Sequence, residues 1–478
     1  MNSPTVALPS DTRARIAIDL GAESCRVSLL RWPGGKPTIE LVHRIANGPV
    51  HRDRALCWPL ANILSGLEDG LRLAASRAPE GIASIAVDGW AVDYVRLGPD
   101  GKPLADPFCY RDERTLAAKA KVDAIIPPER LFALAGAQPL RINTLYQLVA
   151  DAESGVDSNA PWLCLPEYVL HWLGAPRVAE FTNATHTGLV DLVTGNWSEA
   201  LFKQLGIPFS AAPPIVPTGS ILGPLRGPLA ELPAFRETIL IAPACHDTAS
   251  AIAAIPTPQK NTAYISCGTW SLVGMQVDQA IATQEALAAR FTNQGAASGG
   301  FLFHTNVNGL WILKQCMDDW AGQGRPQLLE SLLQAAETLP APAHLLNVDA
   351  EPLLLEGEMP ARINQQLAAT GAQLLPDTPG SEPLFTRLIL ESLAARYAQV
   401  LADLQRITGK SFTGVHVLGG GSRNTLLLRL TAQHTGLNVE AGNPESSTLG
   451  NFAVQLASSS FAPLTPNALY RGAQSLLS

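Results

Sequence analysis

The sequence has no run of lysine and arginine of the kind that follows a nucleic-acid backbone, and its formal net charge is -8. We therefore do not expect nucleic acid as a partner. Charged residues make up only 16% of the 478 residues and hydrophobic residues 46%, which is typical of a globular protein and not of a disordered one. Because the overall field is negative, an anionic ligand must be held by local backbone dipoles, a metal ion and a few cations.

Paired cysteines and long apolar runs are also missing. The cysteines are odd in number and include no C-x-x-C pair, which argues against a disulfide framework and a structural zinc site. No stretch approaches the ~18 apolar residues of a membrane span, and residues 1–15 lack the apolar core of a signal peptide. We expect a cytoplasmic protein with no membrane partner. The seven cysteines are Cys25, Cys57, Cys109, Cys164, Cys245, Cys267 and Cys316.

The length exceeds what one hydrophobic core usually serves, so we expect two domains with a ligand in the cleft between them. An extended apolar segment with a glycine-containing bend occurs twice, over 16–30 and 262–275. The repetition predicts duplicated domains that divide near Ile255.

Strands that alternate with helices predict an α/β fold. Apolar residues at helical spacing predict helices over 56–78, 306–320 and 384–407. Short apolar runs predict strands over 82–87, 239–242 and 415–418. The proline-rich stretches 208–233 and 339–360 read as loops or irregular excursions and not as independent domains.

The first candidate for chemistry is Asp19, which lies in a predicted strand just before the turn from Gly21 to Arg26. A glycine turn lets backbone N–H groups approach an anion, and a carboxylate beside it can hold magnesium. The pattern is compatible with a magnesium-phosphate site, although an ordinary polar hairpin bend has the same features.

The second candidate is Asp247, at a predicted junction between a strand and a helix. A carboxylate at such a position can accept a proton from an attacking hydroxyl. Asp247 and Thr248 are equally suited to cap the helix. The segment alone leaves both roles open.

The third candidate is the triple glycine from Gly419 to Gly421, between a predicted strand and helix. Bare backbone there permits a flat ligand such as adenine-ribose to lie close. The sequence lacks G-x-G-x-x-G and Gly-Lys-Ser/Thr spacing at this point, which disfavours dinucleotide and P-loop folds.

The fourth candidate segment contains Asp88 and Asp93. Residues five apart on a continuous strand face opposite sides, so these acids would not form the carboxylate pair of a glycosidase. Trp90 between them can stack on a sugar face, or be a core tryptophan flanked by solvated acids.

In their order along nearly the whole chain, these segments resemble the FGGY carbohydrate kinases, and within them the rhamnulokinase branch. The resemblance implies two actin-like, ribonuclease-H-type α/β domains, a sugar-binding domain over 1–255 and a nucleotide-binding domain over 256–478, with hinge closure of the cleft. The matching segments are 19–26, 88–93, 110–115, 246–250, 266–272, 309–311, 419–424 and 447–451.

The resemblance also implies ATP and Mg²⁺ as cofactors, with Asp247 as the base that deprotonates a sugar hydroxyl. It implies Asp19 and Asp247 as metal-binding residues. The implied sugar-binding residues are Asp88, Trp90, Ala91, His246, Asp247, Thr248 and Asn306. The implied nucleotide-binding residues are Ala22, Glu23, Ser24, Cys25, Arg26, Gly268, Thr269, Lys314, Gly420, Gly421 and Asn424.

Four residues depart from the family pattern. Glu23 stands where the family has a serine or threonine that donates to phosphate, and Cys25 replaces a small residue. Ala91 replaces a glycine near the sugar, and Lys314 replaces a glutamine. A carboxylate at position 23 would repel ATP unless it turns away, binds metal or is protonated.

The implied activity is transfer of the γ-phosphoryl group of ATP to L-rhamnulose, giving L-rhamnulose 1-phosphate, by a monomer or homodimer. Kinases for L-fuculose, D-ribulose or D-xylulose are alternatives, as is a catalytically weak sugar- or nucleotide-binding regulator. A glycoside hydrolase using Asp88 ranks last because it leaves the triple glycine unexplained.

Overall fold

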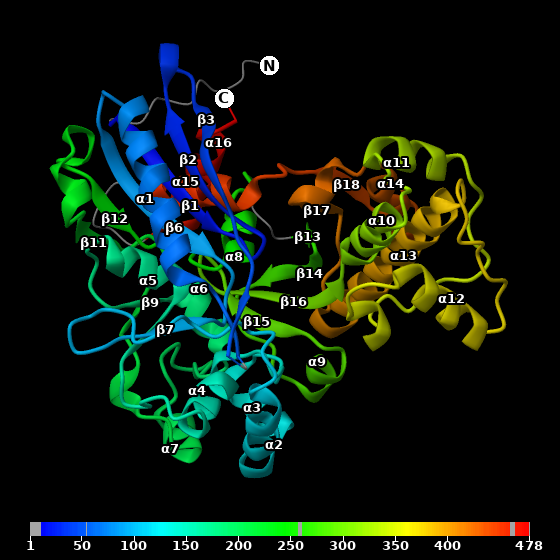
Figure 1. The fold of residues 1–478 in the computed structure, drawn as a ribbon, viewed down its shortest axis with the longest axis horizontal. Helices are drawn as coiled ribbons and strands as arrows, with labels where there is room; N and C mark the ends of the chain where they lie inside the picture. The colour runs from blue at the N-terminus through cyan, green and yellow to red at the C-terminus, as the bar shows by residue number, and fades with distance from the viewer. Residues whose placement is uncertain (1–10, 54, 257–260, 459–463, 478) are drawn as a thin grey trace. The chain divides into compact units, whose positions relative to one another are not determined.

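The computed structural model describes residues 11–53, 55–256, 261–458 and 464–477, which form two compact units (Figure 1). The first unit comprises Met1–Pro258, Val277–Phe303 and Ser446–Ser478, and the second comprises Gln259–Gln276 and His304–Glu445. The two domains expected on either side of residue 255 stay a prediction. The compact units are not continuous in sequence, because the first unit also contains Val277–Phe303 and Ser446–Ser478.

The first unit is built on a six-stranded sheet in the order β11-β12-β6-β1-β2-β3. β1 pairs antiparallel with β2 and parallel with β6, so the predicted hairpin and the predicted strand over 82–87 are both present. All seven residues of β1 are buried, as expected for a central strand. The strands are β1 (Ala14–Leu20), β2 (Ser24–Arg31), β3 (Thr38–Ala46), β6 (Ile82–Gly89), β11 (Ile221–Pro224) and β12 (Ile239–Ile241).

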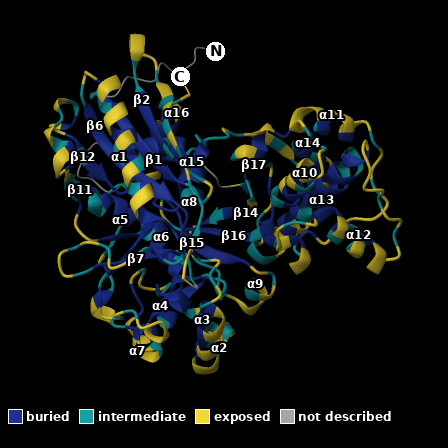
Figure 2. Cartoon of the chain, in the orientation of Figure 1, coloured by how far each residue is buried: buried dark blue, intermediate teal, exposed yellow. Residues whose placement is uncertain are grey.

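Side chains on β1 and β6 alternate between two faces of this sheet. Ile16, Ile18 and Leu20 belong to the core that includes the apolar side of α1 (Leu60–Arg77), the helix predicted over 56–78. Ala17 packs instead with Phe452 of α15 (Ser446–Ala457). Figure 2 shows α1 with one buried and one exposed side.

The first unit also contains three short strand pairs and further helices. Three short strand pairs are β4 (Val50–Arg52) with β5 (Ala55–Cys57), β7 (Tyr94–Arg96) with β8 (Trp162–Cys164), and β9 (Ala179–Glu180) with β10 (Ile215–Val216). The other helices are α2 (Thr115–Ile125), α3 (Pro128–Ala135), α4 (Thr144–Glu153), α5 (Leu165–Trp172), α6 (Phe181–Ala184), α7 (Glu199–Leu205), α8 (Asp247–Ala253), α9 (Gln284–Ala288) and α16 (Pro466–Ser475).

A second six-stranded sheet has the order β15-β16-β14-β13-β17-β18. β13 and β14 form the second predicted hairpin, and β13 pairs parallel with β17, as β1 does with β6. This shared topology agrees with the duplication expected from the sequence. The strands are β13 (Thr262–Cys267), β14 (Trp270–Val277), β15 (Thr292–Gly295), β16 (Phe301–Asn308), β17 (Gly414–Leu418) and β18 (Asn438–Ala441). The helices of the second unit are α10 (Trp311–Gly322), α11 (Leu329–Glu337), α12 (Met359–Ala369), α13 (Glu382–Thr408) and α14 (Thr425–Thr435).

Two expectations about local structure are wrong. The predicted helix over 306–320 begins only at Trp311, because Asn306 belongs to strand β16, which is buried along nearly its whole length and so shows no clear alternation. The proline-rich stretch 208–233 is not all loop, since β11 forms an edge strand that ends at Pro224. An edge strand tolerates proline because one side of its backbone needs no partner.

Two further expectations concern cysteines and membranes. All seven cysteines are buried free thiols in the structure. In the described part of the chain, no helix combines the length and the apolar character that crossing a bilayer requires.

Candidate active site

Three carboxylates gather near the C-terminal ends of strands β1 and β6 in the first unit's sheet. Asp19 on β1 and Asp88 on β6 are register partners in a parallel ladder. Gly89 forms a parallel bridge with His246, which places the start of α8, and so Asp247, near the same strand ends. Burial is the main cause that raises the pKa of Asp19 and of Asp88, and the charge of Asp247 adds to both shifts, so the three acids interact electrostatically. We call Asp19, Asp88 and Asp247 the acid cluster.

Asp19 is 4% exposed and is held by two donors. Its Oδ2 accepts hydrogen bonds from Arg26 Nη1 at 3.0 Å and from Ser447 Oγ at 2.7 Å. Burial raises its pKa, while the Arg26 charge and the Ser447 bond act in the opposite direction. The arrangement fixes the orientation of this carboxyl group.

Asp88 is fully buried. Its Oδ2 accepts a 2.7 Å bond from Asn451 Nδ2, and its Oδ1 has no hydrogen-bond partner among the described residues. Burial and then the Asp19 charge raise its pKa well above the ordinary value for an aspartate. Asp88 has no exposed surface in the structure, and its direct contact with a sugar stays a prediction.

Asp247 is the open member of the acid cluster. It is the first residue of α8, and its side chain is 41% exposed. Its Oδ1 accepts from the Thr248 backbone N–H at 2.5 Å and lies 3.0 Å from His246 Nδ1. The helix cap is His246, whose ring nitrogen accepts from the Thr248 N–H. Asp247 therefore has a carboxylate oxygen available for a ligand, as a base requires.

Buried acids support the backbone just before Asp247, a feature that the sequence analysis missed. Glu180 Oε2 accepts the Cys245 N–H at 2.9 Å, and Thr182 Oγ1 accepts the His246 N–H at 3.3 Å. Glu167 Oε1 in turn accepts the Glu180 N–H at 3.1 Å. Burial raises the pKa of Glu167 to about 7. No local pattern separates such acids from surface glutamates, because their contacts are long-range.

The predicted sugar-side residues Trp90 and Ala91 follow the end of β6. The strand stops at Gly89 and the chain turns, with Val92 at φ 72°. Ala91 is buried, and Trp90 packs against Trp58 with ring centroids 4.5 Å apart.

Both of these tryptophan indoles donate to Asp93 Oδ2, whose pKa burial raises to about 6. The chain from Asp88 to Asp93 is thus not one continuous strand, and both acids are buried and not solvated. Sugar contact by Trp90 stays a prediction.

A second aromatic pair lies beside the acid cluster. The rings of His186 and His246 are 4.7 Å apart, and Thr248, also predicted on the sugar side, is buried next to Asp247. His186 precedes Gly188 in a short 3-10 turn and had no sequence signal.

The predicted first phosphate loop is a tight turn between β1 and β2. A Cβ at Gly21 would lie 2.5 Å from the Ser24 carbonyl oxygen, so the turn requires glycine. Glu23 is exposed, Ala22 and Ser24 are half-buried, and Cys25 is buried.

The side chains of two residues predicted to bind nucleotide there, Cys25 and Arg26, have contacts within the protein. Burial raises the pKa of the Cys25 thiol to about 12, and this side chain is a buried free thiol. Arg26 is the cross-strand partner of Asp19 and donates to it. Nucleotide contact by Ala22, Glu23, Ser24, Cys25 and Arg26 stays a prediction.

In the second unit, three chain segments meet around Gly268 and Thr269. The Leu310 N–H donates to the Gly268 carbonyl at 2.9 Å, and the Gly309 N–H donates to the Thr269 carbonyl at 3.1 Å. A Cβ at Gly421 would overlap the sulfur of Cys267. The structure thus brings the predicted second phosphate loop and the triple glycine together.

Tyr397 on α13 contacts the residues on both sides of this loop. Its hydroxyl lies 2.7 Å from Ser271 Oγ and 3.7 Å from Cys267 Sγ, and all three side chains are buried. These contacts fix both ends of the turn that contains Thr269.

Of three further predicted ligands in the second unit, two have local contacts and one has an unpaired amide oxygen. Asn424 caps α14, accepting the Leu427 N–H at 3.0 Å. Lys314 on α10 pairs with Asp318 at 2.7 Å and is 48% exposed. Asn306 is half-buried on β16, and its Oδ1 has no hydrogen-bond partner among the described residues. Their ligand roles stay predictions.

Comparison with known proteins covers nearly the whole chain. Residues 15–254 match the N-terminal domain of the FGGY family of carbohydrate kinases, and residues 263–459 match its C-terminal domain. The chain is 33% identical over 442 residues to a rhamnulokinase from Bacteroides thetaiotaomicron, covering 92% of this chain and 89% of the relative.

Solved structures share the fold at lower identity. A xylulose kinase from Lactobacillus acidophilus has a TM-score of 0.77 at 16% identity, over 96% of this chain and 91% of that one. Glycerol kinase from Plasmodium falciparum, solved with ADP, has a TM-score of 0.70 at 14% identity, over 92% and 88%. The chain belongs to the FGGY family of carbohydrate kinases and is a phosphotransferase with an alcohol group as acceptor.

Proposed function

We propose that this kinase transfers the γ-phosphoryl group of ATP to L-rhamnulose, giving L-rhamnulose 1-phosphate and ADP. The observation that carries the catalytic part is the open Asp247 carboxylate beside buried Asp19 and Asp88. The choice of sugar rests on the rhamnulokinase relative at 33% identity.

In the proposed reaction, Asp247 accepts the proton of the sugar hydroxyl as that oxygen attacks the γ-phosphorus. The new oxygen–phosphorus bond forms as the bond to the β,γ-bridging oxygen breaks, and the electron pair leaves with ADP. Position and charge stabilisation supply most of the acceleration in such transfers. The Cys245 and His246 N–H groups donate to Glu180 and Thr182, and these bonds hold the backbone just before Asp247, which keeps the base in place.

Among the described residues no three His, Cys, Asp or Glu side chains are placed to hold a metal ion together. Asp19 and Asp247 are the members of the acid cluster that would hold a magnesium ion, whose other ligands would be phosphate oxygens and water. Magnesium usually takes only one or two protein carboxylates and keeps several waters. Asp247 is open, and Asp19 near the end of β1 is buried with Oδ2 already bonded. When bound, the ion would neutralise charge on the phosphates. Gly268, Thr269, Gly420 and Gly421 would contact the nucleotide through backbone and hydroxyl groups.

Coupled ADP release across a ketose panel tests the proposal. With ATP and magnesium, L-rhamnulose should give the highest kcat/KM, ahead of L-fuculose, D-ribulose and D-xylulose. Chelating magnesium with EDTA should abolish turnover, and excess magnesium should restore it. Sugar binding without turnover would instead support a regulator, and preference for another ketose would overturn the choice of sugar.

The exposed carboxylate of Glu23 gives a second test. Glu23→Thr removes a negative charge from the turn after β1 and supplies a hydroxyl donor, so ATP should bind about 10-fold more tightly. Isothermal titration gives the Kd, and Glu113→Thr is a control at another exposed glutamate. An unchanged Kd would mean that Glu23 points away from the phosphates.

A further inference from the structure

Helix α15 carries a ladder of polar side chains on a buried face. Ser447, Asn451 and Gln455 are spaced four residues apart, so they lie along one side of the helix. Asn451 and Gln455 are almost wholly buried, which is unusual for amides without a specific partner. We call these three residues the α15 ladder.

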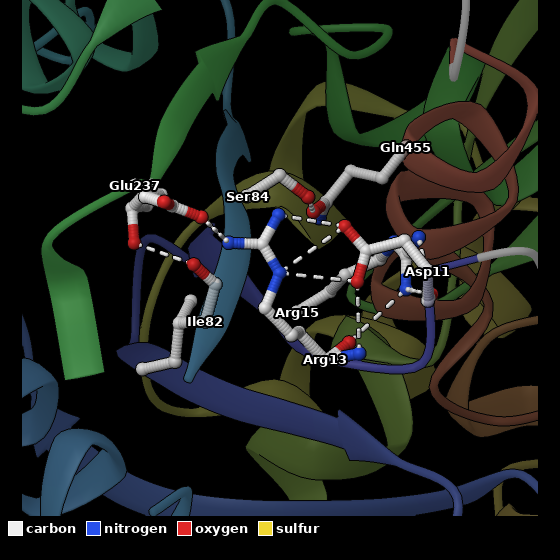
Figure 3. Close-up of polar contacts among 8 residues, drawn as sticks. Asp11, Arg13, Arg15, Ile82, Ser84, Glu237 and Gln455 are labelled. Carbon is white, nitrogen blue, oxygen red and sulfur yellow. Dashed lines mark hydrogen bonds and ion pairs between the residues drawn. The ribbon is translucent and has the colours of Figure 1, made fainter. Parts of the chain in front are cut away.

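Each member of the ladder bonds to β1 or β6. Ser447 Oγ donates to Asp19, and Asn451 Nδ2 donates to Asp88, both at 2.7 Å. Gln455 Nε2 donates to the Ile16 carbonyl at 2.9 Å. Its Oε1 accepts from Ser84 Oγ at 2.6 Å, as Figure 3 shows. Gln455 also donates to Asn451 Oδ1 at 2.7 Å, which joins the two amides.

The same helix contacts α8, which carries Asp247. Ser250 Oγ donates to the Ser447 carbonyl at 2.9 Å. A Cβ at Gly450 would lie 1.6 Å from the Ser250 carbonyl oxygen, so the two helices touch backbone to backbone. A single helix therefore contacts all three elements that bear the acid cluster.

Packing alone does not account for this ladder. An apolar face would bury more favourably against a sheet, because buried amides must recover the cost of lost hydration through hydrogen bonds. Ser447 and Asn451 donate to the carboxylates of Asp19 and Asp88. Only Gln455 bonds to a backbone carbonyl and a serine instead. The polar character thus matches the position of the acids.

We propose that Ser447 and Asn451 are positioning residues for phosphoryl transfer, which hold Asp19 and Asp88 so that β1, β6 and α8 present Asp247 in a fixed geometry. This inference rests on the proposed function. Neither residue is assigned a contact with substrate. Their effect should fall on kcat and on the magnesium dependence, while KM for the sugar stays nearly constant.

Matched serine-to-alanine variants test the inference. Ser447→Ala removes the ladder bond to Asp19, and Ser84→Ala removes a bond of similar length to the lowest member of the ladder. Ser447→Ala should lower kcat about 10-fold and raise the magnesium concentration for half-maximal rate, since small misplacements of reacting groups are costly. Ser84→Ala should keep kcat within about 2-fold. Ser447→Thr, which keeps the hydroxyl, should restore the rate.

Asn451→Ala should lower kcat further, and circular dichroism with a melting curve shows whether it folds. If it does not fold, the comparison of Ser447→Ala with Ser84→Ala still tests the inference. Equal kcat values for Ser447→Ala and Ser84→Ala, or a change in sugar KM alone, would overturn the inference. Absence of sugar-dependent turnover in the unaltered protein would instead overturn the proposed function, so the two failures are distinguishable.

Discussion

Asp247→Asn should lower kcat by about 10³-fold or more, because a positioned general base contributes about 10²–10⁴-fold and asparagine cannot accept the proton. The substitution keeps the shape of the side chain and a carbonyl oxygen that can accept the Thr248 N–H. ATP affinity should stay near normal, because the candidate nucleotide loops around Gly268 and Gly421 do not depend on this side chain.

Rapid-quench measurement of a single turnover, together with the Kd for ATP, separates these two effects. Asp191→Asn is a matched control, because that aspartate also accepts backbone N–H bonds, from Val193 and Thr194 in a turn. The control should retain full activity. Unchanged turnover in Asp247→Asn would remove Asp247 as the base.

Gly450→Ala should destabilise the protein more than other glycine-to-alanine changes in its helices. Alanine gains about 1 kcal/mol over glycine in a helix interior. At Gly450, however, the new Cβ would lie 1.6 Å from the Ser250 carbonyl oxygen and 2.6 Å from its carbon, and neither backbone atom can rotate away. Overpacking of this kind costs typically about 1–3 kcal/mol, so after the gain from helix propensity we expect a net loss of up to about 2 kcal/mol in the free energy of unfolding.

Urea denaturation measures this loss. Gly322→Ala is the control, since Gly322 ends α10 and a methyl group added there would meet nothing within 4 Å, so this variant should be neutral or slightly stabilised. Activity should also fall in Gly450→Ala, because separating α15 from α8 displaces Asp247. Equal stability of the two variants would contradict the close approach of the helices.

Local sequence patterns were sufficient for the features that depend on neighbours in the chain. The two hairpins, the helix of α1, and the positions of Asp19 and Asp247 at strand or helix ends follow from apolar spacing and turn residues. Glycine turns also identified the segment around Gly421, because few other residues tolerate such close backbone contact.

Contacts between distant residues could not be predicted in this way. Ser447 and Asp19 are 428 positions apart, and no periodicity relates them. Asp88 and Asp93 would face opposite sides only on a continuous strand, whereas the positive φ of Val92 and the two indole bonds to Asp93 reflect tertiary packing. Asn306 was placed in a helix for a related reason, since a strand buried on both faces has no period to detect.

Phosphorus NMR of the reaction products tests the central claim most directly. With equal amounts of ATP and L-rhamnulose and with magnesium present, the account predicts a new sugar phosphate ester that appears in step with ADP, and no ester in Asp247→Asn. ADP accompanied by inorganic phosphate alone, or ester formed at an undiminished rate in Asp247→Asn, would contradict it.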